Sequence, residues 1–240
     1  MTPAPITALP WDSALFGFPI ARVNATRLDA AALDAALAAC RAQAIRCAYL
    51  LLDADDAHGS QLAQATGFVV RDVRLELERP LERDTARRAA DATAVGPARL
   101  EQRPALDALA REAFPLSRFF ADPGFPRERC GDLYAAFLAR GLDGAPERRT
   151  LATADASGFV VCHLDEPRSV GTIELIAVAA DARGSGDGSA LVAGALETFT
   201  AAGLRTAEVV TQAANVASQR LYARAGFRTR RARVWLHRWF

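Results

Sequence analysis

Hydrophobic positions change their period repeatedly along the first 80 residues, and the changes predict alternating strands and helices. Apolar runs at 18–23 and 48–52 predict buried strands, and alternating apolar and charged residues at 69–77 predict a half-exposed strand. Apolar residues recur at helical intervals over 29–46, and a shorter helix is expected over 58–66, before a glycine. This part of the chain is therefore predicted to be a small α/β unit.

A longer series of elements is expected in the second part of the chain. The expected helices span 104–110, 127–140, 188–202 and 215–225. The expected strands span 98–101, 149–154, 159–164, 170–178, 206–211 and 233–239. Between the two parts, the sequence is rich in charge, alanine and threonine and poor in large apolar residues. We therefore predict a unit at 1–82, a linker at 83–97 and a second domain at 98–240.

Composition narrows the class of protein. The chain has 240 residues, of which 51% are hydrophobic and 24% charged, with a net charge of +1. These values are typical of a soluble globular protein and do not indicate nucleic acid or membrane as a partner. The start of the chain lacks the pattern of a secretory signal, and the four cysteines lack the spacing of a metal or redox motif. We expect a cytoplasmic protein without a metal.

A glycine-rich loop is the first feature with chemistry. An apolar strand ending at Val178 leads into the loop Arg183–Gly188, and an amphipathic helix follows. Glycines at alternate positions allow successive backbone N–H groups to point at one anion, and the helix N-terminus adds partial positive charge. The chain contains 29 arginines and no lysine. A phosphate-loop NTPase motif, which needs lysine, is therefore excluded. The pattern favours a pyrophosphate site, against the alternative of an ordinary glycine turn.

The second feature is a short helix that carries polar groups on one face. Asn215 suits the N-cap of this helix, and Tyr222 follows seven residues later, about two turns along the same face. Gly226 ends the helix and Phe227 begins the next strand. Taken alone, Tyr222 is also well explained as a packing residue.

Together, in this order and spacing, the two features resemble the acetyl-CoA-binding half of the GNAT acetyltransferase superfamily. The resemblance covers about residues 98–240 and implies a GNAT fold, that is, a mixed and mostly antiparallel sheet flanked by helices. It implies an acetyl-CoA-dependent N-acetyltransferase in which Tyr222 is the catalytic acid. The cofactor-binding residues that it implies are Ile176, Ala177, Val178, Arg183, Gly184, Ser185, Gly186, Asp187, Gly188, Ser189, Asn215 and Tyr222.

A narrower resemblance extends to other parts of the chain. The segments 9–18, 113–119, 210–212 and 234–236 are similar to stretches of the TDP-fucosamine acetyltransferases, which acetylate a nucleotide-linked 4-amino sugar and whose N-terminal half is a degenerate α/β unit. This similarity implies a nucleotide sugar as acceptor, with Arg118, Phe119, Thr211 and Gln212 on the substrate side. Arginine suits a diphosphate. For Arg118 and Phe119, a loop anchored by packed phenylalanines is the alternative.

Other functions stay open at this point. The acceptor is alternatively an antibiotic, a polyamine or a protein amine, and a non-catalytic acyl-CoA-binding module is a third hypothesis. A homodimer is one assembly that we consider.

The proton acceptor of the reaction is less well defined by the sequence. Glu174 is the candidate base, because a carboxylate in a mainly apolar strand needs a role or a partner. Strand alternation places it on the same face as Ile176 and Val178. The alternative is an edge position that pairs with an arginine, and His163 is the rival base. The basic run from Arg228 to Arg233 either attracts phosphates or forms the solvated face of a terminal hairpin.

Overall fold

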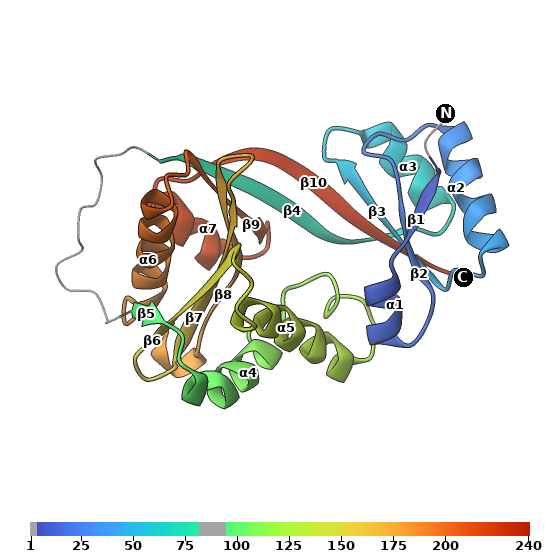
Figure 1. Cartoon of the computed structure of the whole chain (residues 1–240). Helices are drawn as coiled ribbons and strands as arrows, with labels where there is room; N and C mark the ends of the chain where they lie inside the picture. Colours follow the sequence, from blue (N-terminus) through green and yellow to red (C-terminus); the bar gives the residue numbers. More distant parts are fainter. Residues whose placement is uncertain (1–3, 82–94) are drawn as a thin grey trace.

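A computed structural model describes residues 4–81 and 95–240 and contains one ten-stranded sheet (Figure 1). The strands are β1 (Ile6–Ala8), β2 (Ile20–Val23), β3 (Cys47–Asp53), β4 (Val69–Pro80), β5 (Val95–Pro97), β6 (Arg148–Thr153), β7 (Gly158–Asp165), β8 (Val170–Val178), β9 (Thr206–Gln212) and β10 (Arg228–Trp239). The helices are α1 (Pro10–Phe16), α2 (Ala30–Ala42), α3 (Ala57–Ala65), α4 (Arg103–Glu112), α5 (Arg127–Leu142), α6 (Asp187–Ala201) and α7 (Val216–Arg224). The predicted linker 83–97 lies outside the described residues, except for β5.

The sheet runs without interruption through both parts of the chain. Its order is β1-β2-β3-β10-β4-β9-β8-β7-β6-β5, so the last strand of the chain lies between two strands of the first 80 residues. In the described residues, only β2 with β3 and β8 with β9 pair in parallel, and the other neighbours are antiparallel. The two long strands β4 and β10 connect two lobes (Figure 1), and the predicted mixed, mostly antiparallel sheet with flanking helices is confirmed.

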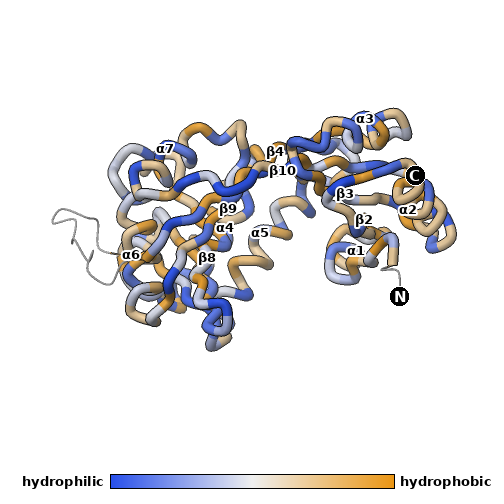
Figure 2. The backbone as a smooth tube through the Cα atoms, turned by 90° about the horizontal axis from the view of Figure 1, so that it is seen from above, coloured by the Kyte–Doolittle hydropathy of each residue, from blue (hydrophilic) through white to orange (hydrophobic). Residues whose placement is uncertain are grey.

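Helices cover both faces of the sheet in the larger lobe. Leu175 and Ala177 of β8 pack in one apolar cluster with α4 and α5, whereas Ile176 and Val178 pack in another with α6 and α7. A third cluster joins β2 and β3 to α2 in the smaller lobe. Figure 2 shows α5 between the lobes, beside the crossing of β4 and β10. Among the described residues, no helix is both long and apolar enough to cross a membrane.

Most of the predicted elements are present, with three differences. The strand expected at 98–101 is wrong, because the side chain of Gln102 accepts from the Arg99 backbone N–H and the segment turns into a 3-10 helix at Leu100–Gln102. Helix α1 and strands β1 and β5 were not predicted. The strand expected to begin at Phe227 and the strand expected over 233–239 form one continuous strand, β10, whose arginines pair with carboxylates on the neighbouring strands.

Candidate active site

A gap opens between the parallel strands β8 and β9. Their pairing begins at Val170 opposite Thr206 and ends at Ile173 opposite Val209, although β8 continues to Val178 and β9 to Gln212. Beyond the last pair, the backbone of β8 has no partner in β9. Unpaired backbone N–H and C=O groups along two diverging strands can bind an amide-containing ligand inserted between them.

A β-bulge on β8 lies at the start of this gap. Val161 of β7 pairs with Leu175, and the next residue, Cys162, pairs with Ile173, so Glu174 is the extra residue. A bulge displaces the following side chains by one position relative to strict alternation. The expectation that Glu174 shares a face with Ile176 and Val178 is therefore wrong. Those two residues face α6 and α7.

Glu174 instead reaches Arg148 on the α4 and α5 side of the sheet. Arg148 Nε donates to Glu174 Oε2 over 3.0 Å, and Arg148 Nη1 binds Glu147. The Glu174 side chain remains 35% exposed, against 14% for Arg148. The carboxylate thus has the arginine partner considered from the sequence, and it is also partly open to solvent.

The glycine loop at the end of β8 has the backbone form that an anion site requires. Gly184 and Gly186 have φ of 90° and 102°, and a Cβ on either would meet nothing within 4 Å. Positive φ, rather than crowding, is therefore the reason for glycine at both positions. The loop is exposed from Arg183 to Gly186, and Gly186 is the N-cap of the 15-residue helix α6. The first N–H groups of this helix point out of its N-terminus.

Among the predicted cofactor residues, Asp187 points in a different direction from the loop. It is buried, and its Oδ2 accepts from Ser157 Oγ over 3.3 Å, in the turn between β6 and β7. Its side chain thus fastens the first turn of α6 to the sheet, and its backbone N–H donates to Ser185 Oγ. Ser185 Oγ also donates to the Ala182 carbonyl oxygen, which closes the loop on itself.

Helix α7 places Asn215 and Tyr222 as predicted. Asn215 is the N-cap, and its Oδ1 accepts from the Ser218 backbone N–H over 3.1 Å. Tyr222 is only 2% exposed and packs in the same cluster as Ile176, Val178 and Val209, where β8 and β9 diverge. Burial raises the pKa of its phenol, so the hydroxyl stays protonated at neutral pH.

Arg118 lies on the other side of the site, on the loop between α4 and α5. Its guanidinium carbon stands 4.2 Å from the ring centre of Tyr49, 4.0 Å from that of Phe119 and 4.2 Å from that of Trp235. Arg118 Nη1 lies 2.7 Å from His237 Nε2, and within residues 4–81 and 95–240 it forms no ion pair with a carboxylate. Phe119 itself is buried beneath Arg118, so it supports the arginine.

Thr211 and Gln212, which were predicted together, point to opposite faces of the sheet. Thr211 pairs with Leu75 and is buried, whereas Gln212 pairs with Arg74. Gln212 therefore shares a face with a polar surface of β4, β9 and β10, where a shallow pocket of about 220 Å³ is found. Its charged lining residues are Arg74, Glu76, Glu208, Arg230 and Arg233.

Three arginines in the basic run of β10, Arg230, Arg231 and Arg233, form ion pairs within the chain. Arg233 Nη2 binds Glu76 Oε1, Arg230 lies near Glu76, Glu78 and Glu208, and Arg231 Nε donates to Asp53. The run is part of a long strand rather than of a terminal hairpin. Figure 2 shows this hydrophilic stretch of β10 at the crossing with β4.

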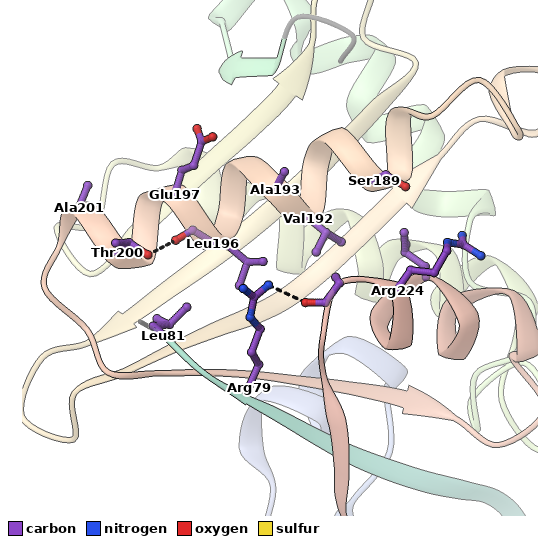
Figure 3. Close-up of a pocket in the computed structure, with 12 residues that line it drawn as sticks. Arg79, Leu81, Ser189, Val192, Ala193, Leu196, Glu197, Thr200, Ala201 and Arg224 are labelled. Atoms are coloured by element: carbon purple, nitrogen blue, oxygen red, sulfur yellow. Dashed lines mark hydrogen bonds between the residues drawn. The ribbon is translucent and has the colours of Figure 1, made fainter. Parts of the chain in front are cut away.

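A larger pocket of about 650 Å³ lies between α6 and α7 (Figure 3). Figure 3 shows Leu196 pointing from α6 towards Arg79, whose guanidinium donates to the Ala225 carbonyl oxygen over 2.6 Å. Of the predicted cofactor residues, only Ser189 lines this pocket. The pocket is therefore adjacent to the glycine loop but does not contain it.

Sequence reasoning missed the residues that hold Arg118 in place. Tyr49, Asp122, Trp235 and His237 come from distant parts of the chain, and each looks like an ordinary strand or loop residue. A histidine in the apolar last strand was the one available signal. His163, the rival base, is partly exposed on β7 opposite Thr172, away from this cluster. In the described parts of the chain, no three His, Cys, Asp or Glu side chains are grouped as a metal site.

Comparisons with known proteins agree with this geometry. No curated protein matches the sequence. The chain is similar in fold to a GCN5-related N-acetyltransferase from Sphaerobacter thermophilus, with 15% identity, a TM-score of 0.67 and coverage of 98% of this chain and 76% of the other. A GCN5-related N-acetyltransferase from Kribbella flavida has 15% identity, a TM-score of 0.64 and coverage of 99% and 88%.

A third similar structure is a GCN5-related glucosamine N-acetyltransferase region of a fungal multi-domain β-N-acetylglucosaminidase. It has 16% identity and a TM-score of 0.60, and the match covers 97% of this chain and 30% of the other. The family model for the GNAT acetyltransferases matches residues 106–227. These residues include the diverging strands, the glycine loop and helix α7. This chain therefore belongs to the GNAT acetyltransferase family.

Proposed function

We propose that this acetyltransferase moves the acetyl group of acetyl-CoA to the 4-amino group of a nucleotide-activated deoxyamino sugar, with dTDP as the nucleotide. One observation carries the choice of acceptor: the guanidinium of Arg118 is held between aromatic rings without a carboxylate partner among the described residues. The charges of Asp12 and Asp72 act on Arg118, but neither carboxylate forms an ion pair with it. A partly buried cation gains most from a charged group in direct contact, and a diphosphate on the acceptor supplies that contact.

The position of Arg118 suits the length of such an acceptor. Arg118 contacts Trp235 on β10, which pairs with Asp72 on the neighbouring strand β4. Two residues further along β4, Arg74 pairs with Gln212 at the end of β9. From β10 to β9 are two strand spacings, or about 10 Å. An amine directed into the gap beside β9 therefore leaves room for a sugar ring before the phosphates reach Arg118.

The cofactor half of the site fits acetyl-CoA, the co-substrate of the family. The exposed loop from Arg183 to Gly186, with the N-terminus of α6, would hold the pyrophosphate through backbone N–H groups. The unpaired backbone of β8 at Ile176–Val178 would hold the pantetheine arm. Asp187 would contribute its backbone only, because its side chain is bonded to Ser157.

The chemical roles follow from what acetyl transfer needs. The amine must lose a proton, and Glu174 is the proposed acceptor of that proton, directly or through water, because it carries a partly exposed carboxylate and directly follows the last residue of β8 that pairs with β9. Tyr222, kept protonated by burial, is the proposed donor to the departing thiolate. Backbone N–H groups released by the bulge are suited to stabilise the oxyanion.

Release of thiol from acetyl-CoA tests the acceptor. The protein is assayed with dTDP-4-amino-dideoxysugars beside the free amino sugars, a polyamine, an aminoglycoside and a peptide amine. Selective turnover of the dTDP sugars is the expected result, because the free sugars lack the anion for Arg118. Equal or better turnover of the free sugars, or turnover with another amine alone, would exclude the nucleotide sugar.

A pair of variants tests the role of Glu174. Glu174→Gln and Glu147→Gln each remove a carboxylate that binds Arg148, but only Glu174 lies on the bulge. We expect Glu174→Gln to lower kcat by about 10²-fold or more and Glu147→Gln to leave kcat within about twofold. Similar small effects of both variants would mean that Glu174 is only an ion-pair partner.

A further inference from the structure

The Arg118 side chain is attached to a buried chain of hydrogen bonds. His237 on β10 and Asp122 on the loop between α4 and α5 have side chains that are 0% exposed. His237 Nδ1 lies 2.7 Å from Asp122 Oδ2, and His237 Nε2 lies 2.7 Å from Arg118 Nη1. The chain Asp122–His237–Arg118 therefore runs from the protein interior to the partly exposed guanidinium.

The donors in this chain can be assigned from chemistry. A guanidinium only donates, so His237 Nε2 must accept from Arg118. The ring then carries its proton on Nδ1 and donates it to Asp122. Burial lowers the pKa of His237 to about 4, despite the opposing effect of Asp122, so the ring is neutral at neutral pH, as this assignment requires.

Several contacts besides the hydrogen bond to His237 hold the side chain of Asp122 in place. Besides His237, its carboxylate accepts from Trp239 Nε1 over 3.1 Å and from the Gly124 backbone N–H over 3.0 Å, and Arg71 Nε lies 3.3 Å away. Gly124 permits this arrangement, because a Cβ there would lie 2.2 Å from the Trp239 ring. The carboxylate of Asp122 thus connects the loop between α4 and α5 to strands β4 and β10.

The rings around Arg118 restrict the guanidinium further. Tyr49, Phe119 and Trp235 lie about 4 Å from its central carbon, at 4.2, 4.0 and 4.2 Å. Cation–π contacts cover the faces of the guanidinium, while its N–H edges remain the places for hydrogen bonds. One edge is directed to His237. The orientation of the other N–H groups is set by this contact.

We propose that Asp122 and His237 are positioning residues that orient Arg118 to bind an anionic group of the acceptor. The inference rests on the proposed function, in which that group is the nucleotide diphosphate. Neither residue touches the reacting atoms in this proposal. Their loss should weaken acceptor binding and leave acetyl-CoA binding unchanged, since the glycine loop and α6 lie elsewhere in the fold.

Two variants of one residue separate positioning from packing. In His237→Gln, the side-chain oxygen can still accept from Arg118 at the place of Nε2. In His237→Asn, the shorter amide can still donate to Asp122 at the place of Nδ1 but does not reach Arg118. Both remove the same ring from the same buried place, so a purely structural role predicts that dTDP binding follows the stability of each variant in a urea melt and not its contact with Arg118.

The binding test uses dTDP, titrated by calorimetry onto protein saturated with CoA so that the glycine loop is occupied. We expect His237→Asn to weaken dTDP binding by about tenfold or more and His237→Gln by less than about threefold. The affinity for CoA should be the same in both variants. Equal weakening of dTDP binding by the two variants would overturn the positioning role.

A second readout needs no acceptor. Arg118 should react slowly with an arginine-specific dicarbonyl reagent in the wild type and in His237→Gln, and faster in His237→Asn, as measured by peptide mass spectrometry. If the wild type does not bind dTDP, the nucleotide acceptor is wrong, and these rates alone decide the positioning role. Equal rates in the two variants would overturn it.

The tautomer provides a third check. The chain has three histidines, and the signal lost in either variant identifies His237 in a long-range proton–nitrogen spectrum. A protonated Nδ1 with an unprotonated Nε2 is expected at neutral pH. The opposite tautomer, or a charged ring, would contradict the assignment of Arg118 as donor to His237.

Discussion

Replacement of Gly186 by alanine should separate the conformation of the glycine loop from the binding of acetyl-CoA that we propose for it. Gly186 has φ of 102°, outside the range that residues with a Cβ adopt readily. No atom lies within 4 Å of the added Cβ, so steric contact with the rest of the protein contributes nothing. The effect therefore comes from the backbone alone.

The expected magnitude follows from that conformation. If the loop keeps its form, alanine costs about 1–2 kcal/mol, which lowers the Tm of a chain of this length by roughly 2–4 °C. If the loop relaxes to negative φ, the stability recovers, but the N–H groups of the loop turn away from the pyrophosphate. The same 1–2 kcal/mol then appears as about 5–30-fold weaker acetyl-CoA binding.

Gly203→Ala is the matched control. Gly203 follows the other end of α6, has φ of 72° and also has no atom within 4 Å of an added Cβ. The two glycines are separated by the length of the 15-residue helix, about 22 Å. Thermal melts and calorimetric titration with acetyl-CoA are measured on both variants.

We expect Gly203→Ala to lose stability with unchanged acetyl-CoA affinity. For Gly186→Ala, the losses in the free energy of unfolding and in the free energy of acetyl-CoA binding should add up to about 1–2 kcal/mol. Part of this total should be a loss of affinity, which the control does not show. If both variants bind acetyl-CoA equally well and melt alike, the loop is an ordinary turn and the anion site is refuted.

Three further predictions use different parts of the structure. Tyr222→Phe keeps the packing of the buried ring, so kcat should fall about 10²–10⁴-fold while acetyl-CoA affinity, measured by calorimetry, stays constant; an unchanged kcat would exclude the phenol as the acid. Gly171→Ala places a Cβ 2.2 Å from the Phe199 ring and should lower the free energy of unfolding by about 1–3 kcal/mol in a urea melt. The double variant Gly171→Ala/Phe199→Leu should recover part of this loss, and a neutral effect of Gly171→Ala would show that α6 moves freely on the sheet. Burial lowers the folded-state pKa of His237 to about 4 from an unfolded value near 6.5, so the unfolded state binds the extra proton and the free energy of unfolding should fall as the pH drops from about 6.5 to 4. His237→Gln should flatten the plot of this free energy, measured by urea denaturation, against pH in that range. An unaltered plot would contradict a neutral buried ring.

The backbone of the proposed cofactor half was predictable because its signals are local. Gly184 and Gly186 need positive φ, Asn215 caps its own helix, and Val170–Val178 is an apolar strand, so each can be recognised from a few consecutive residues. The bulge at Glu174 was not predictable in the same way. It depends on the register between β7 and β8, which strand alternation alone does not contain.

The acceptor half was only partly predictable, because its geometry depends on long-range pairing. Arg118 was a candidate from its loop, but its contacts come from Tyr49 on β3 and from Trp235 and His237 on β10. These strands are neighbours only because β10 inserts between β3 and β4. Phe119 was expected to meet the substrate and instead supports the arginine, a difference that only packing decides.

The insertion of β10 also decides what the first 80 residues do. Strand β4 pairs with β9 from Arg74 to Pro80 and with β10 over most of its length, so it stands between the cofactor gap and the last strand. Without β3 and β4, the edges of β9 and β10 would be unpaired, and unpaired edges favour aggregation. Arg118 would also lose its contact with the ring of Tyr49 on β3. The N-terminal unit is thus needed both to complete the sheet that carries the gap between β8 and β9 and to build one wall of the proposed acceptor site.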